Sequence, residues 1–337
     1  MPKNELLSIP RVSIVMPAYN AEQFIGEVIS TILSQTFKNF ELIIIDDGST
    51  DDTAAVIKQY SSIDTRIKYY HQKNKGSARL ADTINIGISK SNSPLIARAD
   101  SDDPWFLDKL QRQIDFMDKN PEYVIIGGAA EVTDERGQHL YTLIAPIDHE
   151  DHIRSMTLYT TLAHGSVMFT RDAFNRTGGY KNLHAVEDLD LWQRMSDEGK
   201  VYSFPEPLFK YRKNTQGISM SNWWVQAQEL ERLGDSFFDT HTPNVLSHRV
   251  LSKKLAEIDA ACNERGAPSN IALATKLKLL DDNRRIAKKF KAKGMTKEWI
   301  RQYLAVALSS KLGLKLTVKS IIKNATTKVK RLISSKN

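Results

Sequence analysis

Short apolar runs alternate with amphipathic stretches along the first third of this chain. The runs are rich in Val and Ile and have the length of buried strands, whereas the stretches between them repeat apolar residues every three or four positions, as a helix with one buried face does. Four strands are predicted, at residues 12–16, 40–45 and 67–71 and in a run from residue 96 that stops at Asp100. Because helical patterns lie between them, we expect an α/β fold with a mostly parallel, Rossmann-like sheet flanked by helices.

After residue 103 the pattern predicts a less regular half, followed from residue 225 by a helical and increasingly basic extension. The predicted elements are a helix at 108–118, strands at 124–126 and 140–144, and a turn at Gly178-Gly179-Tyr180. A length of 337 residues suits one main domain with an appendage. We therefore expect a main domain at 1–220, with halves at about 10–103 and 104–220, and a C-terminal region at 221–337.

Composition narrows the class of protein. The apolar content of 41% is ordinary for a globular protein, and the single cysteine, Cys262, excludes an intramolecular disulfide and fits a reducing compartment. Residues 1–10 lack the apolar core of a signal peptide, and no window has the roughly 20 apolar residues of a spanning helix. These features predict a cytoplasmic protein that does not cross a membrane.

The net charge of +7 hides a basic tail on an acidic body. Residues 241–337 hold 22 Lys and Arg against 6 Asp and Glu, whereas residues 1–240 hold 25 against 34. An amphipathic basic helix is expected at about 312–333, with lysines on one face at Lys311, Lys315, Lys319 and Lys323. Such a helix can lie on an anionic membrane, here the inner face of the cell membrane, or can be a solvated or partner-binding face. Nucleic acid is not an expected partner, because the tail lacks interleaved aromatic residues.

Acidic residues gather where two predicted strands end. Asp46 and Asp47 follow one strand, and Asp100, Asp102 and Asp103 follow another with no basic residue among them. Ligands of open α/β sheets bind outside the carboxyl ends of the strands, and carboxylates there suit Mg²⁺ or Mn²⁺ carrying a substrate diphosphate. An Asp-Ser-Asp-Asp sequence alone is also typical of a solvated turn or a helix N-cap. The neighbouring motifs must decide between these interpretations.

The ordered set of motifs resembles the family 2 glycosyltransferases, which have a GT-A fold. It comprises Pro17-Ala18-Tyr19-Asn20, the segment from Asp46 to Asp51, Asn74 with Gly76, and Asp100-Ser101-Asp102-Asp103. The resemblance implies that Pro17, Tyr19 and Asp47 hold the nucleoside, that Asp100 binds the ribose and that Asp102 binds Mn²⁺ or Mg²⁺. It also places Glu22 and Arg79 near the nucleotide. Independently, Gly76 before a predicted helix could bring a phosphate to the helix N-terminus, where Arg79 could reach it.

A second acidic pair, Glu187-Asp188, precedes the apolar and aromatic residues Leu191 and Trp192. The resemblance to inverting members of the family implies that Asp188 is the catalytic base, which removes the proton of the acceptor hydroxyl as its oxygen attacks the anomeric carbon. The pair could instead only charge a helix N-terminus. Glu187, His164 and Trp192 are candidates for the acceptor site, although a histidine in the setting of His164 is as often structural.

The stretch from Pro205 to Arg212, with Ser219 beyond it, resembles the closing loop of the family, in which Arg212 would pair with the diphosphate. Lys213-Asn214 stands where many members carry a histidine, so a metal contact from this loop is not expected. The chain also lacks the Gln-x-x-Arg-Trp sequence of processive members, which favours transfer of a single sugar. Farther on, Trp223-Trp224 could border the acceptor or pack in the core.

The sequence therefore predicts an inverting, metal-dependent glycosyltransferase that uses a nucleotide sugar, most simply a UDP-sugar. Its expected acceptor is a saccharide or lipid-linked saccharide of the kind found in lipopolysaccharide or capsule synthesis. Two alternatives stay open at this point. A sugar-phosphate nucleotidyltransferase should carry a Gly-rich, Arg-containing loop after its first strand, which Pro17-Ala18-Tyr19-Asn20 is not. A non-catalytic saccharide- or membrane-binding protein would retain the fold without a working base.

Overall fold

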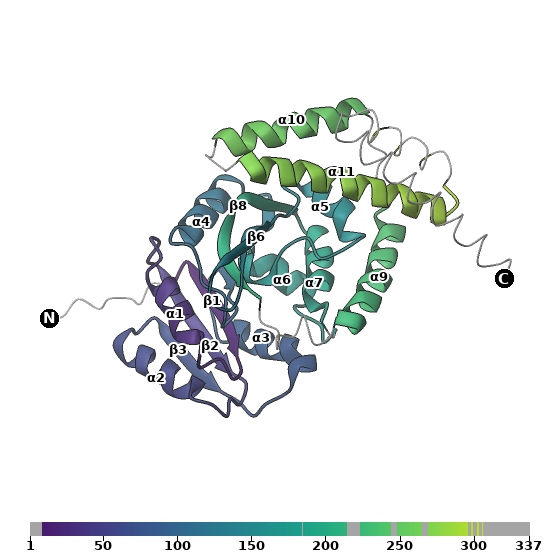
Figure 1. Ribbon diagram of the computed structural model, residues 1–337. Coiled ribbons are helices and arrows are strands. Elements are labelled where there is room, and N and C mark those ends of the chain that lie inside the picture. Colours follow the sequence, from purple (N-terminus) through teal and green to yellow (C-terminus); the bar gives the residue numbers. More distant parts are fainter. Residues whose placement is uncertain are drawn as a thin grey trace, which may run out of the picture.

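The computed structural model describes residues 9–183, 185–213, 223–243, 248–264 and 269–295, together with residues 298, 302 and 305. Within these residues, one mixed sheet of eight strands runs through the molecule with helices packed on it (Figure 1). Four of its strand pairings are parallel and three are antiparallel. The predicted α/β class is therefore confirmed.

The N-terminal half of the sheet is wholly parallel. Its strands are β1 (Val12–Ala18), β2 (Phe40–Asp46), β3 (Ile67–His71) and β4 (Leu95–Arg98), in the spatial order β3-β2-β1-β4. The connecting helices are α1 (Ile25–Leu33), α2 (Thr53–Ile63), the short 3-10 helix η1 (Ser77–Arg79) and α3 (Leu80–Ser89). Because β2 and β4 lie on opposite sides of β1, the order reverses between β1 and β4, where the carboxyl ends of the strands leave room for a ligand.

The second half adds antiparallel pairings. Its strands are β5 (Tyr123–Thr133), β6 (His139–Leu143), β7 (Met168–Thr170) and β8 (Lys200–Arg212). Strand β7 pairs antiparallel with β4 and β5, while β8 lies parallel to β5. The expected closing loop at 205–212 is thus wrong, since these residues belong to β8. Pro205 and Pro207 are tolerated there because the register with β5 slips beside them.

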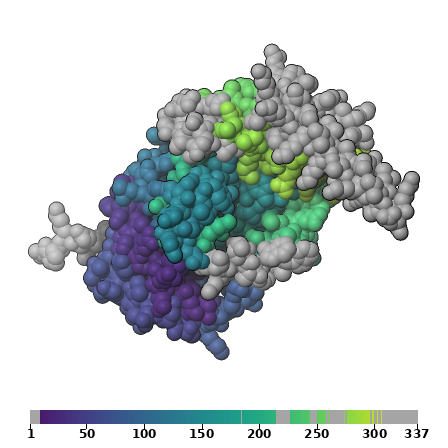
Figure 2. Space-filling model, viewed as in Figure 1, coloured from purple at the N-terminus to yellow at the C-terminus, as the bar shows by residue number. Residues whose placement is uncertain are grey.

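Two apolar cores cover the two faces of the sheet, because successive strand residues point to opposite sides. Ile14 and Met16 of β1 pack with α1 and α4 (Lys109–Lys119), while Val15 packs with α3 and with the helices of the second half. Those helices are α5 (His149–Met156), α6 (Arg171–Thr177) and α7 (Glu187–Ser196). In Figure 2 the purple N-terminal part and the teal middle part form one continuous surface.

Three further helices pack on this body: α9 (Trp223–Thr240), α10 (His248–Glu264) and α11 (Ser269–Ala292). Figure 1 shows α10 and α11 side by side. Phe237 of α9 belongs to the second core, and Arg154 of α5 donates to Asn283 of α11 at 2.9 Å. No helix in the part that the structure describes has the length and apolarity to span a bilayer. The helix expected at 312–333, Ser219 and the side chains of Trp223-Trp224 lie outside the described residues.

Candidate active site

The loops that follow β1 and β2 are tied together at the reversal of strand order. Asn20 has a left-handed backbone, with φ of 46°, and its Oδ1 accepts from the backbone N–H of Thr50 at 2.9 Å. Glu22, predicted to contact the nucleotide, instead accepts from the N–H of Asp52 at 2.8 Å through Oε2. Pro17 is buried in β1, whereas the ring of Tyr19 is 51% exposed at the edge of these loops. Tyr19 is therefore free to receive a planar ligand.

The two acids after β2 have different surroundings. Asp46 is fully buried and accepts from Ser49 N–H at 2.9 Å and from the Tyr69 hydroxyl at 3.0 Å. Burial alone would raise its pKa, but these hydrogen bonds outweigh it and keep the pKa of Asp46 below the usual value. The Oδ1 of Asp47 accepts from Gln72 Nε2 at 2.6 Å and from the Lys75 N–H at 3.2 Å. Asp46 thus holds the turn, and Asp47 is the acid presented toward the end of β3.

Arg79, predicted to contact a phosphate, already pairs with the carboxylate of Asp82. Arg79 ends η1, just after Gly76, whose φ of 79° suits a residue without Cβ. Its side chain is 57% exposed, and its Nε donates to Asp82 Oδ2 at 2.6 Å. A donor phosphate would have to share or replace Asp82 as the partner of this guanidinium.

The acids that follow β4 have a basic neighbour, Arg98, which the sequence analysis did not anticipate. Arg98, the last residue of β4, is 2% exposed, and its Nη2 lies 2.8 Å from Asp100 Oδ1. Asp100 lies just past the end of β4, where Ala99 N–H still donates to the Val15 carbonyl, so the chain stays extended and Arg98 lies on the same side as Asp100. Its Nε is buried with no hydrogen-bond partner in the described part of the chain. Gly165 packs against the same acid, since a Cβ there would lie 2.9 Å from Asp100 Oδ2.

The pKa values of the next two acids, Asp102 and Asp103, are raised by burial and by neighbouring carboxylates. Burial, followed by the charge of Asp100, raises the pKa of Asp102 to about 6. Asp103 is 2% exposed, and burial together with Asp102 raises its pKa well above the usual value. Asp103 Oδ1 accepts from the Arg212 N–H at 2.8 Å and so anchors the end of β8. The carboxylate of Asp102 forms no ion pair with any described side chain.

The sequence predicts that the guanidinium of Arg212 is free to bind a diphosphate, but in the structure the protein itself occupies its donors. Its guanidinium is 7% exposed and donates to the carbonyls of Asp102 at 3.1 Å and Glu135 at 2.9 Å. Its Nη2 also donates to Glu27 Oε2 at 2.7 Å. The geometry therefore corrects the expected role: Arg212 positions the acidic loop, and its donors are already used by the protein.

Glu187 and Asp188 begin α7, as predicted, but their pKa values are raised, which is not expected of acids that only cap a helix. Burial, then the adjacent Glu187 charge, raises the pKa of Asp188 to about 8. Burial also raises the pKa of Glu187, against which Arg98 acts to lower it. A pair that only complemented the helix dipole would be favoured in its charged form, with lowered pKa values. The raised values instead suit a carboxylate that exchanges a proton near neutral pH.

Around this pair lie His164, Tyr180 and Trp192. His164 Nε2 lies 2.9 Å from the Tyr180 hydroxyl, and burial, then the charge of Arg98, lowers the pKa of His164 well below the usual value, so the ring is neutral. Trp192 is completely buried, and its indole N–H donates to the Leu162 carbonyl at 3.3 Å. The expected acceptor contact of Trp192 is therefore wrong, because the whole side chain is core.

Arg98 and Tyr180 are the members of the site that sequence reasoning missed. Arg98 acts on the pKa of Asp102, Asp103, Glu187 and Asp188, so it lies electrostatically between the two acidic groups. The spacing Arg-x-Asp at the end of a strand could have revealed it, since the two side chains share one face. Nothing local could have revealed Tyr180, which reaches the site only through folding.

The carboxylates present can hold a divalent ion only if a substrate supplies its remaining ligands. No group of three or more His, Cys, Asp or Glu side chains in the described ranges is arranged to hold a metal. Mg²⁺ is commonly held by one or two carboxylates together with substrate phosphates, and Asp102 is a partly buried carboxylate that forms no ion pair with a described side chain. The residues present therefore fit an ion that takes its remaining ligands from a diphosphate.

The mixed sheet, with acids at its reversal point and a second acidic pair at the start of α7, has the arrangement that the sequence predicts for a glycosyltransferase. The family model for glycosyl transferase family 2 matches residues 13–178. EpsE of Bacillus subtilis, named as a glycosyltransferase, is 37% identical over 214 residues, which span 62% of this chain and 75% of EpsE. The chain belongs to glycosyltransferase family 2.

Two further comparisons support the fold and the setting. TuaG of Bacillus subtilis, named for teichuronic acid biosynthesis, is 30% identical over 66% of this chain and 90% of its own length. The crystal structure of Staphylococcus aureus TarS 1–349 with UDP-GlcNAc superposes with a TM-score of 0.53 at 15% identity, covering 88% of this chain and 80% of TarS 1–349. The predicted GT-A fold is confirmed, and the chain is a glycosyltransferase with relatives in cell-surface polysaccharide synthesis.

Proposed function

We propose that this glycosyltransferase is an inverting, metal-dependent hexosyltransferase that moves one sugar from a UDP-sugar to a saccharide acceptor, free or lipid-linked. The observation that carries the proposal is the position of Arg98, one buried cation that acts on the acids after β4 and on the Glu187-Asp188 pair. Because the charge of the same arginine acts on both acidic groups, donor and acceptor chemistry can take place at one site, called the acidic site below. TarS binds UDP-GlcNAc on the same fold, which supports UDP as the nucleotide.

On the donor side, Tyr19 offers an exposed ring and Asp47 a carboxylate for the nucleoside, beside Pro17. Asp100, oriented by Arg98, would accept hydrogen bonds from the ribose hydroxyls. Asp102 would hold Mg²⁺ or Mn²⁺, and a divalent ion there supplies positive charge where the departing diphosphate becomes more negative. Arg79 would approach the phosphates from the exposed side of η1.

On the acceptor side, Asp188 would act as the general base. Its pKa of about 8 lies close to neutral pH, where a carboxylate is basic enough to take a hydroxyl proton and still ionises in part. The bond from the acceptor oxygen to the anomeric carbon forms as the bond to the diphosphate oxygen breaks, and the proton passes to Asp188. Attack from the face opposite the leaving group inverts the anomeric centre. Glu187 would keep Asp188 basic, and the neutral His164 would border the acceptor.

Family membership removes the nucleotidyltransferase alternative. The non-catalytic alternative is tested by a panel of UDP-, GDP- and dTDP-sugars, each measured for hydrolysis and for thermal stabilisation with Mg²⁺, with Mn²⁺ and with chelator. A UDP-sugar should raise the melting temperature and be hydrolysed only with metal, because a ligand that binds the folded state stabilises it. Stabilisation by a sugar nucleotide without turnover on any acceptor would favour a binding protein instead.

We also propose that the chain divides near residue 220 and that its basic C-terminal end holds it at the inner membrane face. The support is the charge of residues 241–337, with 22 basic against 6 acidic residues. Deleting residues 313–337 should abolish sedimentation with vesicles that contain anionic lipid. Unchanged sedimentation would remove this part of the proposal.

A further inference from the structure

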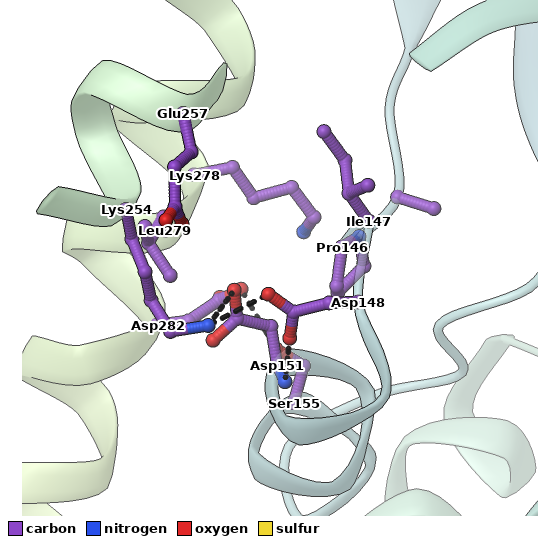
Figure 3. A pocket seen from close by; sticks show the side chains of 11 residues that line it. Pro146, Ile147, Asp148, Asp151, Ser155, Lys254, Glu257, Lys278, Leu279 and Asp282 are labelled. Carbon is purple, nitrogen blue, oxygen red and sulfur yellow. Dashed lines mark hydrogen bonds and ion pairs between the residues drawn. The ribbon is translucent and has the colours of Figure 1, made fainter. Parts of the chain in front are cut away.

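A cavity lies where the C-terminal helices meet the main body of the chain, and none of its lining residues belongs to the acidic site. It measures about 190 Å³ and lies between α10, α11 and the segment at residues 145–155 (Figure 3). This volume equals that of about six water molecules at ~30 Å³ each, well below the cavities that hold drug-sized ligands. It is the size of one small ring-shaped molecule. Pro146, Ile147 and Leu279 supply its apolar walls.

Some of the polar groups in the cavity are already paired. Lys254 of α10 donates to Asp148 Oδ2 at 2.7 Å and to Asp151 Oδ2 at 3.3 Å. Asp282 Oδ2 accepts from the Ser155 hydroxyl at 3.1 Å and from the Tyr159 hydroxyl at 2.5 Å. These contacts hold α10 and α11 against α5. The walls of the cavity are therefore fixed by side-chain hydrogen bonds between these helices.

Two other polar groups form no hydrogen bond or ion pair with a described residue. Lys278 Nζ lies 3.7 Å from the centre of the Tyr159 ring, but no described residue accepts a hydrogen bond or forms an ion pair with it. Figure 3 shows its side chain extending from α11 across the cavity toward Pro146 and Ile147. Burial lowers the pKa of Lys278. Opposite, Asp151 is 7% exposed, and its buried Oδ1 has no hydrogen-bond partner among the described residues. An unused donor thus extends into the cavity, and an unused acceptor lies buried in its wall.

The chemistry of the lining selects the class of ligand. Four acids, Asp148, Asp151, Glu257 and Asp282, face two lysines, so a phosphate or another anion is disfavoured. No described cluster holds three metal-ligating side chains, and the Lys278 ammonium repels other cations. A neutral ring with several hydroxyls satisfies both free groups, because each hydroxyl can donate and accept, and it can lay its C–H face on apolar walls.

We propose that this cavity binds one sugar residue of a saccharide, with hydroxyls joining Lys278 to Asp151 and the ring resting on Ile147 and Leu279. The inference rests on the proposed function, since a transferase that acts on saccharide acceptors meets such chains. A second site would hold a growing glycan by a residue remote from the one that reacts. The effective concentration of the acceptor at the acidic site would then rise without any new contact there.

The test uses the full chain and saturation-transfer NMR with the methyl glycosides of glucose, galactose and N-acetylglucosamine as probes. Spectra are taken without UDP and with UDP and Mg²⁺ in excess, so that the acidic site is occupied in the second set, and inorganic phosphate is run as a separate probe. At least one glycoside should bind, and Lys278→Met should weaken it about tenfold or more, because hydrogen bonds to charged groups are among the stronger ones. Lys288→Met, an exposed lysine of the same helix, is the matched control and should change nothing. Ala145→Phe, which fills the cavity from the loop side, should have the effect of Lys278→Met without altering α11.

The inference is overturned if no glycoside binds, if binding survives both Lys278→Met and Ala145→Phe, if UDP displaces the probe, or if phosphate is the only probe that depends on Lys278. Turnover of UDP-sugar on a short acceptor is measured separately. Normal turnover without glycoside binding would defeat this inference alone, whereas glycoside binding without turnover would defeat the proposed function alone.

Discussion

The guanidinium of Arg98 and the carboxylate of Asp100 form an ion pair at the carboxyl end of β4, with 2.8 Å between Nη2 and Oδ1. Arg98 is almost wholly buried, so its charge is little screened and reaches Glu187 and Asp188 as well as the acids beside it. This pair is the electrostatic link between the acids that follow β4 and the acidic start of α7.

Removing the arginine should destabilise the protein. Arg98→Met leaves Asp100 and its acidic neighbours without their buried counter-charge, and breaking such a pair by removing one partner costs about 3 kcal/mol or more. Chemical denaturation at pH 7.5 measures the loss. Arg176→Met, which breaks only exposed pairs with Asp172 and Glu198, is the control and should have little effect. Equal effects of the two substitutions would show that Arg98 is not the centre of the acidic site.

The pH dependence of transfer should report the raised pKa of Asp188. A base must be ionised to act, so kcat/KM should rise about tenfold per pH unit below neutrality and level off above about pH 8. Glu187→Gln removes the negative neighbour that helps to raise this pKa, so the midpoint should move to lower pH. Glu231→Gln, an exposed change on α9, should leave the profile in place. A midpoint that does not respond to Glu187 would argue against Asp188 as the titrating group.

The same pKa shift predicts a cost in stability. In the folded chain Asp188 holds its proton up to about pH 8, whereas in the unfolded chain it loses it near pH 4, so the free energy of unfolding falls as pH rises between these values. Asn resembles the protonated acid. Asp188→Asn should therefore be more stable than the native chain at pH 8.5, with a smaller advantage at pH 5, in denaturant titrations at both pH values. An advantage independent of pH would contradict the raised pKa.

Metal binding is tested at Asp102 by a readout other than turnover. Calorimetric titration with UDP should show tighter binding in Mg²⁺ or Mn²⁺ than in chelator, because the ion would bridge Asp102 and the diphosphate. Asp102→Asn should remove most of this metal dependence. Asp108→Asn, an exposed acid just beyond the motif, should retain it. If Asp102→Asn binds UDP with full metal dependence, another group holds the ion.

Much of the fold could be predicted because its signals are local. The strands of the N-terminal half appear within two residues of their predicted bounds, since β1, β2 and β4 are short, largely apolar runs buried in the sheet, and β3 is a short segment rich in strand-favouring residues. Strand β8 escaped prediction because Pro205 and Pro207 are typical of loops, and only the slipped register with β5 allows them in a strand. That pairing depends on tertiary contacts that no local pattern contains.

The candidate site divides in the same way. Asp100, Asp102 and Asp188 could be proposed from short motifs, because acids after apolar runs are visible in the sequence. The partners of Arg212 and the burial of Trp192 could not, since Asp102, Glu27 and Leu162 come from distant parts of the chain. The cavity between α5, α10 and α11 likewise exists only once the C-terminal helices have packed.

The most direct test compares native chain and Asp188→Asn in two measurements made side by side, the affinity for UDP and the rate of sugar transfer in Mg²⁺. The account predicts that the substitution slows transfer by about 10² to 10⁴-fold, the usual contribution of a general base, while the affinity for UDP stays within about twofold. Transfer at the native rate in Asp188→Asn would contradict the central claim that this carboxylate takes the proton of the acceptor.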